Sequence, residues 1–314
     1  MTVAEGIMED ALIKVAAFVV TIVVGYIAGR SGKLGSRPGV TVSTIVFNFT
    51  LPCAVIHAFG AAEFDTSLLI LVPIGFACAA VPYLVTTLIT LKRPREERVF
   101  LMMGGNSFNI GCFALPFIQT VFPAPMAVTA CLFDAGNSVV GTGGSYAVTG
   151  LIASEKPVEH PVKFLAKRLF GSAAFDCYVV LLVLAIAGIR IPEPIVTFTE
   201  PIAGANACLA MLMLGLMLSL RVDSQKLKLV AQDIALRVVF SAILTALVWA
   251  FLPFDATTKA VVSIMLWAPA TAISTTFTLW LGGDAGLAGF ANAITIVIGV
   301  VAAVVILLTT GVIA

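Results

Sequence analysis

Long apolar runs alternate with short polar stretches along the whole chain. A bilayer core of about 30 Å needs roughly 20 apolar residues per helix, so each run of that length predicts a membrane-spanning helix. Ten such runs, bounded by charged residues or by Pro and Gly, lie at residues 11–29, 39–60, 66–91, 99–122, 125–151, 171–189, 194–220, 236–254, 257–281 and 285–313. The pattern predicts an all-α integral membrane protein with ten transmembrane helices.

Composition agrees with this prediction. Of the 314 residues, 60% are hydrophobic and 11% are charged, whereas soluble proteins carry roughly 25% charged residues. The formal net charge is +1, which provides no basic stripe for a nucleic acid. The six cysteines lie within apolar runs without a close CxxC pair, so we expect neither a disulfide framework nor a thiolate metal site.

Basic residues predict the sidedness of the spans, because connections on the cytoplasmic side carry an excess of Lys and Arg. With ten spans, one set of connections holds 15 of the 18 basic residues: Arg30, Lys33, Arg37, Lys92, Arg93, Arg95, Arg98, Lys156, Lys163, Lys167, Arg168, Arg221, Lys226, Lys228 and Arg237. The opposite side has Arg190 and Lys259, with Lys14 in the first span, and collects Glu5, Glu9, Asp10, Glu63, Asp65, Glu193 and Asp255. We therefore expect a multi-pass protein of the plasma membrane with both termini on the non-cytoplasmic side.

Two polar segments deserve separate interpretations. Residues 152–170 form the only long polar insertion and divide the chain into 1–151 and 171–314, each with five predicted spans. Because five is odd, the second set must enter the membrane upside down, as in transporters built from inverted repeats. Residues 221–237 combine Leu and Val at helical spacing with basic residues and are expected to lie on the cytoplasmic interface.

The fourth span of each half contains helix-breaking and polar residues near its middle. Residues 104–116 read GGNSFNIGCFALP, and residues 267–278 read WAPATAISTTFT. Proline removes a helix hydrogen bond, and Gly tolerates non-helical angles. We expect both helices to be broken, with the unwound backbone facing protein or a watery cavity. The alternative is that these residues only permit kinks and close packing.

Three short motifs resemble the auxin efflux carrier family. The stretch FTLPCAVIHAF holds Pro52 and His57, the stretch NIGCFALP holds Asn109 and Pro116, and LWLGGDAGLAGFANA runs from Leu279 to Ala293. The resemblance covers nearly the whole chain, although the long central loop of the plant members is missing. It implies two inverted five-helix repeats, a fold shared with bile acid sodium symporters, in which helices four and nine are broken and cross at a central substrate site. Bacterial relatives, in the inner membrane, are thought to carry carboxylates such as malate or malonate.

A crossing of two broken helices predicts an anion site. The N-terminal ends of half-helices present unpaired N–H groups and partial positive charge, which suit a carboxylate. The expected lining is Asn106, Asn109, Gly111, Pro116, Pro269, Thr271 and Ser274.

Asp134 is the strongest candidate for coupling transport to a cation. It lies near the middle of the fifth span, with Asn137 and Ser138 three and four residues later on the same helical face. A carboxylate in the bilayer is expensive and therefore a functional suspect. We expect Asp134, with Asn137 and Ser138, to bind a proton or Na⁺; no other cofactor is expected. The alternative is a hydrogen-bonded packing residue between helices.

These observations favour a secondary active transporter of a small organic anion, such as malate, malonate or an auxin-like acid, over an enzyme. A channel or a permease subunit of a larger complex remains an alternative, because broken helices also serve channels. A membrane-embedded enzyme is less favoured, since the chain has no HExxH, GxSxG or P-loop motif. The apolar faces of spans two and seven could pair two copies in a homodimer.

Overall fold

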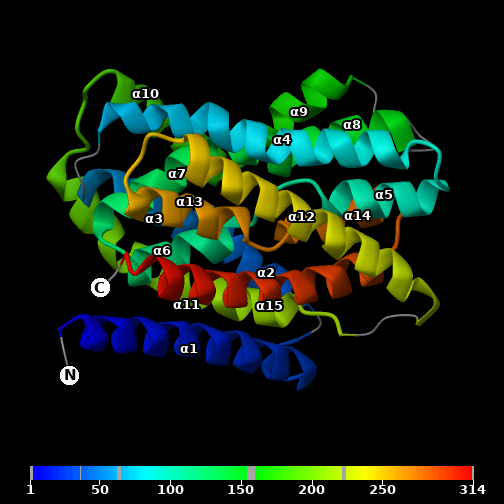
Figure 1. The fold of residues 1–314 in the computed structure, drawn as a ribbon, viewed down its shortest axis with the longest axis horizontal. Helices are drawn as coiled ribbons and strands as arrows, with labels where there is room; N and C mark the ends of the chain where they lie inside the picture. The colour runs from blue at the N-terminus through cyan, green and yellow to red at the C-terminus, as the bar shows by residue number, and fades with distance from the viewer. Residues whose placement is uncertain (1–2, 36, 62–64, 154–159, 221–223, 313–314) are drawn as a thin grey trace.

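Most helices of the molecule run side by side along its longest axis (Figure 1). The structure is a computed structural model that describes residues 3–35, 37–61, 65–153, 160–220 and 224–312. Glu63, Lys156, Arg221 and residues 154–159 of the predicted linker lie outside the described residues. Within the described ranges the regular secondary structure is helical, apart from one isolated β-bridge. The predicted all-α class is therefore confirmed.

The described residues of the first half form eight α-helices with short π- and 3₁₀-helical segments between some of them. They are α1 (Val3–Arg30), α2 (Pro38–Ile45), η1 (Val46–Thr50), α3 (Leu51–Ala61), η2 (Thr66–Ile70), α4 (Leu71–Thr90), α5 (Arg95–Gly104), η3 (Ile110–Ala114), α6 (Leu115–Val121), α7 (Ala124–Val139), η4 (Val140–Gly144) and α8 (Ser145–Ala153). The second half begins with the short amphipathic α9. Its elements are α9 (Pro161–Leu169), α10 (Ala173–Ile186), α11 (Glu193–Met217), η5 (Ser224–Lys226), α12 (Leu227–Phe251), α13 (Ala256–Leu266), α14 (Ala272–Trp280) and α15 (Ala285–Thr310).

Among the described residues, six helical stretches are long and apolar enough to cross a membrane by themselves. They are Met8–Arg30, Pro38–Ala61, Thr66–Thr90, Glu193–Met217, Ser224–Phe251 and Ala285–Thr310. A seventh arises if α9 and α10, which meet at an 82° bend, are counted together. The other predicted spans correspond to shorter or interrupted helices, so length and composition support several spans rather than ten individually.

Two prolines explain local changes of helix type. Proline lacks an N–H group, and its ring crowds the carbonyl group four residues earlier. A π-helical turn, which widens the helix locally, precedes each of them: η1 comes before Pro52, and η3 comes before Pro116.

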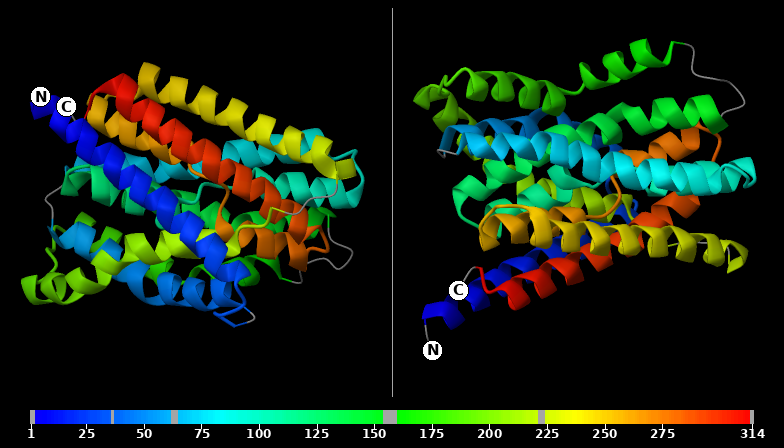
Figure 2. Two further views of the ribbon diagram at one scale, coloured as in Figure 1. Left: turned by 90° about the horizontal axis from the view of Figure 1, so that it is seen from below. Right: turned by 45° about the horizontal axis from the view of Figure 1, so that its top comes forward.

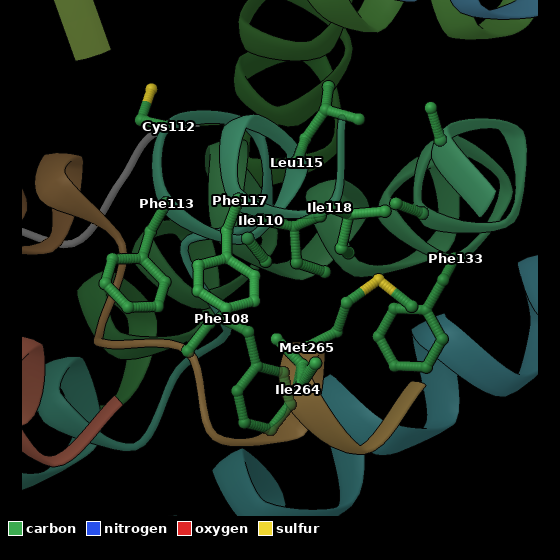
Figure 3. Close-up of a cluster of buried hydrophobic side chains, with 14 of the residues drawn as sticks. Phe108, Ile110, Cys112, Phe113, Leu115, Phe117, Ile118, Phe133, Ile264 and Met265 are labelled. Atoms are coloured by element: carbon green, nitrogen blue, oxygen red, sulfur yellow. The ribbon is translucent and has the colours of Figure 1, made fainter. Parts of the chain in front are cut away.

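The helices pack as two neighbouring groups. In one, α11 lies against α1, α2 and α3; in the other, α4 packs on α7, and α13 packs on α7, α12 and α15. The interrupted helices lie in the interior of this arrangement (Figure 2). Beneath the interruptions, the side chains of Phe108, Phe113 and Phe117 gather with Ile264 and Met265 of α13 in a buried cluster (Figure 3).

One boundary differs from the sequence-based expectation. Residues 227–237, expected on the membrane interface, form the first turns of α12 and continue without a break into the predicted eighth span. The predicted start of the eighth span, residue 236, therefore lies inside a longer helix. In the fold, Asp233 is buried and Arg237 is bound to backbone carbonyl groups of neighbouring helices.

Candidate functional site

Two helical segments are interrupted, and their interruptions cross. The chain leaves the helix after Gly104 and resumes it at Ile110; in the second half it leaves after Leu266 and resumes at Ala272. The Asn109 N–H group donates to the Pro269 carbonyl oxygen at 2.8 Å, and Phe108 and Ala270 form an antiparallel bridge. Backbone groups that leave one helix thus pair with those of the other, as a lipid-buried break requires.

Asn137 of α7 supplies the pairing that Phe108 lacks. Its side-chain oxygen accepts a hydrogen bond from the Phe108 N–H group at 3.0 Å, and its side-chain nitrogen donates to the Phe108 carbonyl oxygen at 2.9 Å. The side-chain amide therefore pairs with both backbone groups of Phe108, as a residue of a neighbouring β-strand would. Since unpaired buried backbone groups are costly, Asn137 stabilises the extended conformation of the break.

A cavity of about 250 Å³ lies beside the crossing. Its wall is built from both breaks, the η1–α3 segment, α7 and the junction of α9 with α10. The polar side chains of the wall belong to Asn48, Ser107, Asn109, Asp134, Asn137, Ser138, Thr142, Arg168, Ser172, Tyr178 and Thr271. The cavity therefore lies between the two groups of packed helices.

Two polar atoms of the cavity wall have no hydrogen-bond partner among the described residues. They are Nδ2 of Asn109, a residue that is only 5% exposed, and Oγ1 of Thr271. Both residues precede the N-terminal end of a resumed helix, where the first N–H groups have no partner within the helix. Unpaired donors beside partial positive charge form a site that suits an anion.

The carboxylate of Asp134 faces the same cavity and is held by two donors. The Tyr178 hydroxyl of α10 donates to Oδ2 at 2.7 Å, and the Asn137 amide donates to Oδ1 at 2.9 Å. Because Asn137 also holds Phe108, a short chain of hydrogen bonds connects α10 through Asp134 to the break after α5.

Arg168 of α9 adds positive charge to the wall. Its guanidinium group lies over the ring of Trp280 at 4.6 Å and over the ring of Phe164 at 5.4 Å. Tyr146 of α8 stacks on Phe164 with 4.9 Å between ring centroids. Such cation–π contacts position the guanidinium group.

Residues 10–155, which contain the first break and most of the cavity wall from α7, match the family model described as membrane transport protein. This matched stretch of the chain is similar to a family of membrane transporters. A comparison with curated proteins gives no match. The resemblance to the auxin efflux carriers is thereby confirmed, and the match implies a membrane transporter.

The transporter brings six of the ten expected site residues to the cavity: Asn109, Gly111, Asp134, Asn137, Ser138 and Thr271. The other four are close to the breaks but do not line it. The Asn106 amide donates to Ser145 Oγ at 3.3 Å, and the Pro269 carbonyl accepts from Asn109. Pro116 and Ser274 are buried inside α6 and α14.

Sequence reasoning missed three residues of this region. Arg168 and Arg237 were interpreted only as determinants of sidedness, and Tyr178 has no signal of its own within an apolar run. The spacing of Asp233 and Arg237, four residues apart at the start of an apolar run, was a usable signal, because such a pair occupies one helical face.

Proposed function

We propose that the transporter is a secondary carrier that moves a small organic anion across the plasma membrane, a bacterial inner membrane, by alternating access. One observation carries the proposal: Asn109 and Thr271, whose side chains each hold a polar atom without a partner among the described residues, both line one cavity at the start of two resumed helices. A carboxylate would satisfy both donors and the helix ends together. Arg168 supplies a second positive group on the same wall.

The size of the cavity favours a small cargo. Sites for drug-sized ligands occupy about 300–1,000 Å³, and this cavity of about 250 Å³ is smaller. Malate and malonate are suitable cargoes in size and charge. A bulkier auxin-like acid would require the cavity to widen.

The proposed architecture is ten spans in two inverted repeats, residues 1–151 and 171–314, joined by the linker 152–170. Two features support it. The start of α1 and the end of α15 lie at the same end of the molecule (Figure 1), as an even number of spans requires, and each half is interrupted in its fourth predicted span. Movement of the group containing α7 and α13 against the group containing α3 and α11 would expose the cavity to each side in turn.

Asp134 is the proposed site of cation coupling. Its carboxylate contacts α10 through Tyr178 and the break through Asn137, so binding of a proton or a metal cation there would change contacts between the two groups of helices. The two donors also explain how a carboxylate is accommodated among buried helices.

The test is a binding screen by thermal shift on the purified transporter. Small mono- and dicarboxylates are added one at a time, with and without Na⁺ and at two pH values; a cargo raises the melting temperature in proportion to its affinity and concentration. A stabilising carboxylate is then tested for saturable uptake into liposomes that contain only this chain. If no carboxylate stabilises the protein while neutral or cationic solutes do, the anion proposal is wrong.

A further inference from the structure

Arg237 of α12 contacts the backbone of both broken segments. Its Nη1 donates to the Gly104 carbonyl oxygen at 3.0 Å, and its Nη2 donates to the carbonyl oxygens of Ser107 and Ala268, each at 2.9 Å. The guanidinium group also lies over the Phe108 ring, 5.1 Å from its centroid. Arg237 is not among the residues that line the cavity, so it contacts the crossing from outside the proposed cargo site.

The three carbonyl groups lie at or just after the C-terminal ends of two helices. Gly104 is the last residue of α5 and Ser107 follows in the break, while Ala268 comes directly after the end of α13. The last carbonyl groups of a helix have no partner within it and carry partial negative charge. Two such ends converge on one point, whereas the corresponding positive ends of the resumed helices face the cavity.

In transporters with broken helices, carbonyl groups of this kind coordinate the coupling Na⁺. Here a guanidinium group holds them. Its planar fork has five fixed donors, which match carbonyl oxygens contributed by two separate segments. A Na⁺ ion at the same place would compete for the same oxygens and be repelled by the like charge.

The surroundings of Arg237 fix its position. Asp233, one turn earlier on α12, packs so closely against Gly104 that a Cβ atom there would lie 1.9 Å from Oδ1 of the aspartate. The adjacent Ser241, one turn later, donates to the Leu266 carbonyl oxygen at 2.6 Å. The first half of α12 therefore packs against both broken segments.

We propose that Arg237 is the resident cation of the crossing: it takes the place of a coupling Na⁺ at the carbonyl ends of the two broken helices, so that the carrier works without Na⁺. This inference rests on the proposed carrier function and deepens it, because it selects the proton rather than Na⁺ as the cation coupled at Asp134. Arg237 is a positioning residue, because it acts on the cargo site through the backbone of the breaks.

The experiment compares melting temperatures of the purified protein in NaCl, KCl and choline chloride at equal ionic strength, without any carboxylate. Wild-type protein is expected to melt within about 1 °C in all three salts. Arg237→Ala is expected to melt at least about 5 °C lower, and millimolar guanidinium chloride is expected to restore at least half of that loss. Arg237→Lys, which keeps the charge, is expected to remain insensitive to the choice of salt.

Lys228→Ala is the matched control, because Lys228 is an exposed basic residue on the same helix. It is expected to melt like the wild type and to gain nothing from guanidinium. A saturable, Na⁺-specific rise in the wild-type melting temperature would overturn the proposal. So would an Arg237→Ala protein that melts like the control, or one that neither guanidinium nor Na⁺ stabilises.

The salt comparison remains decisive if Arg237→Ala does not yield folded protein, because the wild type and Arg237→Lys answer the question of Na⁺ by themselves. The outcome is also separate from that of the carboxylate screen. Guanidinium rescue in a protein that binds no carboxylate would support the resident cation and reject the anion carrier.

Discussion

The oxygen and the nitrogen of the Asn109 side-chain amide have different roles. Its Oδ1 accepts a hydrogen bond from the Cys112 N–H group at 3.3 Å, which caps the resumed helix, whereas its Nδ2 has no partner among the described residues. Asparagine and aspartate both cap helices well. A substitution that keeps the oxygen and removes the donor can therefore separate folding from binding.

Asn109→Asp is expected to fold and to lose affinity for the cargo. The new carboxylate still accepts from Cys112, but a donor to the anion is lost and a like charge is added, so binding should weaken more than about tenfold. The measurement is the carboxylate concentration that gives half of the maximal thermal shift. Gln232→Glu is the matched control: its Oε1 accepts from Arg93 at 2.8 Å outside the cavity, and it should keep wild-type affinity.

Asp134→Asn tests the proposed coupling. The amide retains an acceptor for the Tyr178 hydroxyl group but neither gains nor loses a proton near neutral pH. Uptake into liposomes is expected to lose its dependence on pH or on the cation gradient. Asp176→Asn, a change outside the cavity on α10, should leave that dependence intact. An Asp134→Asn carrier with full and equally cation-dependent uptake would leave Asp134 as a packing residue.

Individual polar residues were visible in the sequence, but their directions were not. Asn109, Thr271 and Asp134 stand out because polar groups are rare in apolar runs. Pro116 and Ser274 stand out for the same reason, yet they lie inside their helices. Helical periodicity assigns a residue to a face only along an unbroken helix. The segment that contains Asn109 and Pro116 and the segment that contains Thr271 and Ser274 both pass through a break.

At the scale of elements, the packing of α12 against the first break depends on the absence of a Cβ atom at Gly104. A Cβ atom on Gly104 would lie 1.9 Å from Oδ1 and 2.6 Å from Oδ2 of Asp233. The close approach places Arg237, one turn later, beside the carbonyl groups that it binds. The position of the Arg237 guanidinium group therefore depends on the close contact between α12 and Gly104 of α5.

Gly104→Ala is expected to destabilise the protein by about 1–3 kcal/mol, because the added methyl group displaces α12. Gly204→Ala is the control, since Gly204 lies inside α11 and a Cβ atom there would meet nothing within 4 Å. That change should be neutral or stabilising by up to about 1 kcal/mol, because alanine is the better helix former. Equal melting temperatures of the two variants would contradict the close packing.

The start of α15 offers a pH-dependent contact outside the spans. Asp284 caps the helix by accepting from the Leu287 N–H group at 2.9 Å, and Lys226 donates to its Oδ2 at 2.7 Å. The hydrogen bond from Lys226, followed by that from Leu287, lowers the pKa of Asp284. A lowered pKa means that the stabilisation is complete above the unfolded value near pH 4 and disappears as the pH falls through the folded value.

Asp284→Asn is therefore expected to be less stable than the wild type at pH 7, by no more than about 1 kcal/mol because the pair is partly exposed. The difference should vanish in strongly acidic solution. Melting temperatures measured against pH check this, and Lys226→Met in the same background should cause little further loss at pH 7 if the two residues act as a pair. A difference that persists unchanged at low pH would exclude the charge interaction.

At the scale of the whole molecule, the order of spans decides which loops share a side. Six helical stretches suffice to cross the membrane individually, and the bent pair α9–α10 would add a seventh. The proposed ten spans also count the two interrupted segments and the α7–α8 segment. Arrangements with six, seven or ten spans differ in which loops lie on which side of the membrane.

Labelling of single cysteines with a membrane-impermeant maleimide, in a cysteine-free background, distinguishes the arrangements with six, seven and ten spans. For ten spans, Ser31→Cys should label only from the cytoplasm, whereas Ala124→Cys and Ala256→Cys should label from outside. All three positions are exposed and lie at helix ends. Six spans would place all three on one side, and seven would place Ser31 and Ala124 together.

The sequence by itself predicted the membrane environment, the helical class and the resemblance to a family of transporters. Hydropathy acts over windows of about twenty residues and needs no knowledge of which helices are neighbours, and glycine and proline mark breaks locally. Only the tertiary structure decided what the breaks contact. The carbonyl groups of Ser107 and Ala268 lie 130 and 31 residues from Arg237 along the chain, and the pairing of Asp134 with Tyr178 spans 44 residues. Such contacts depend on how whole helices pack against one another, which no local pattern contains.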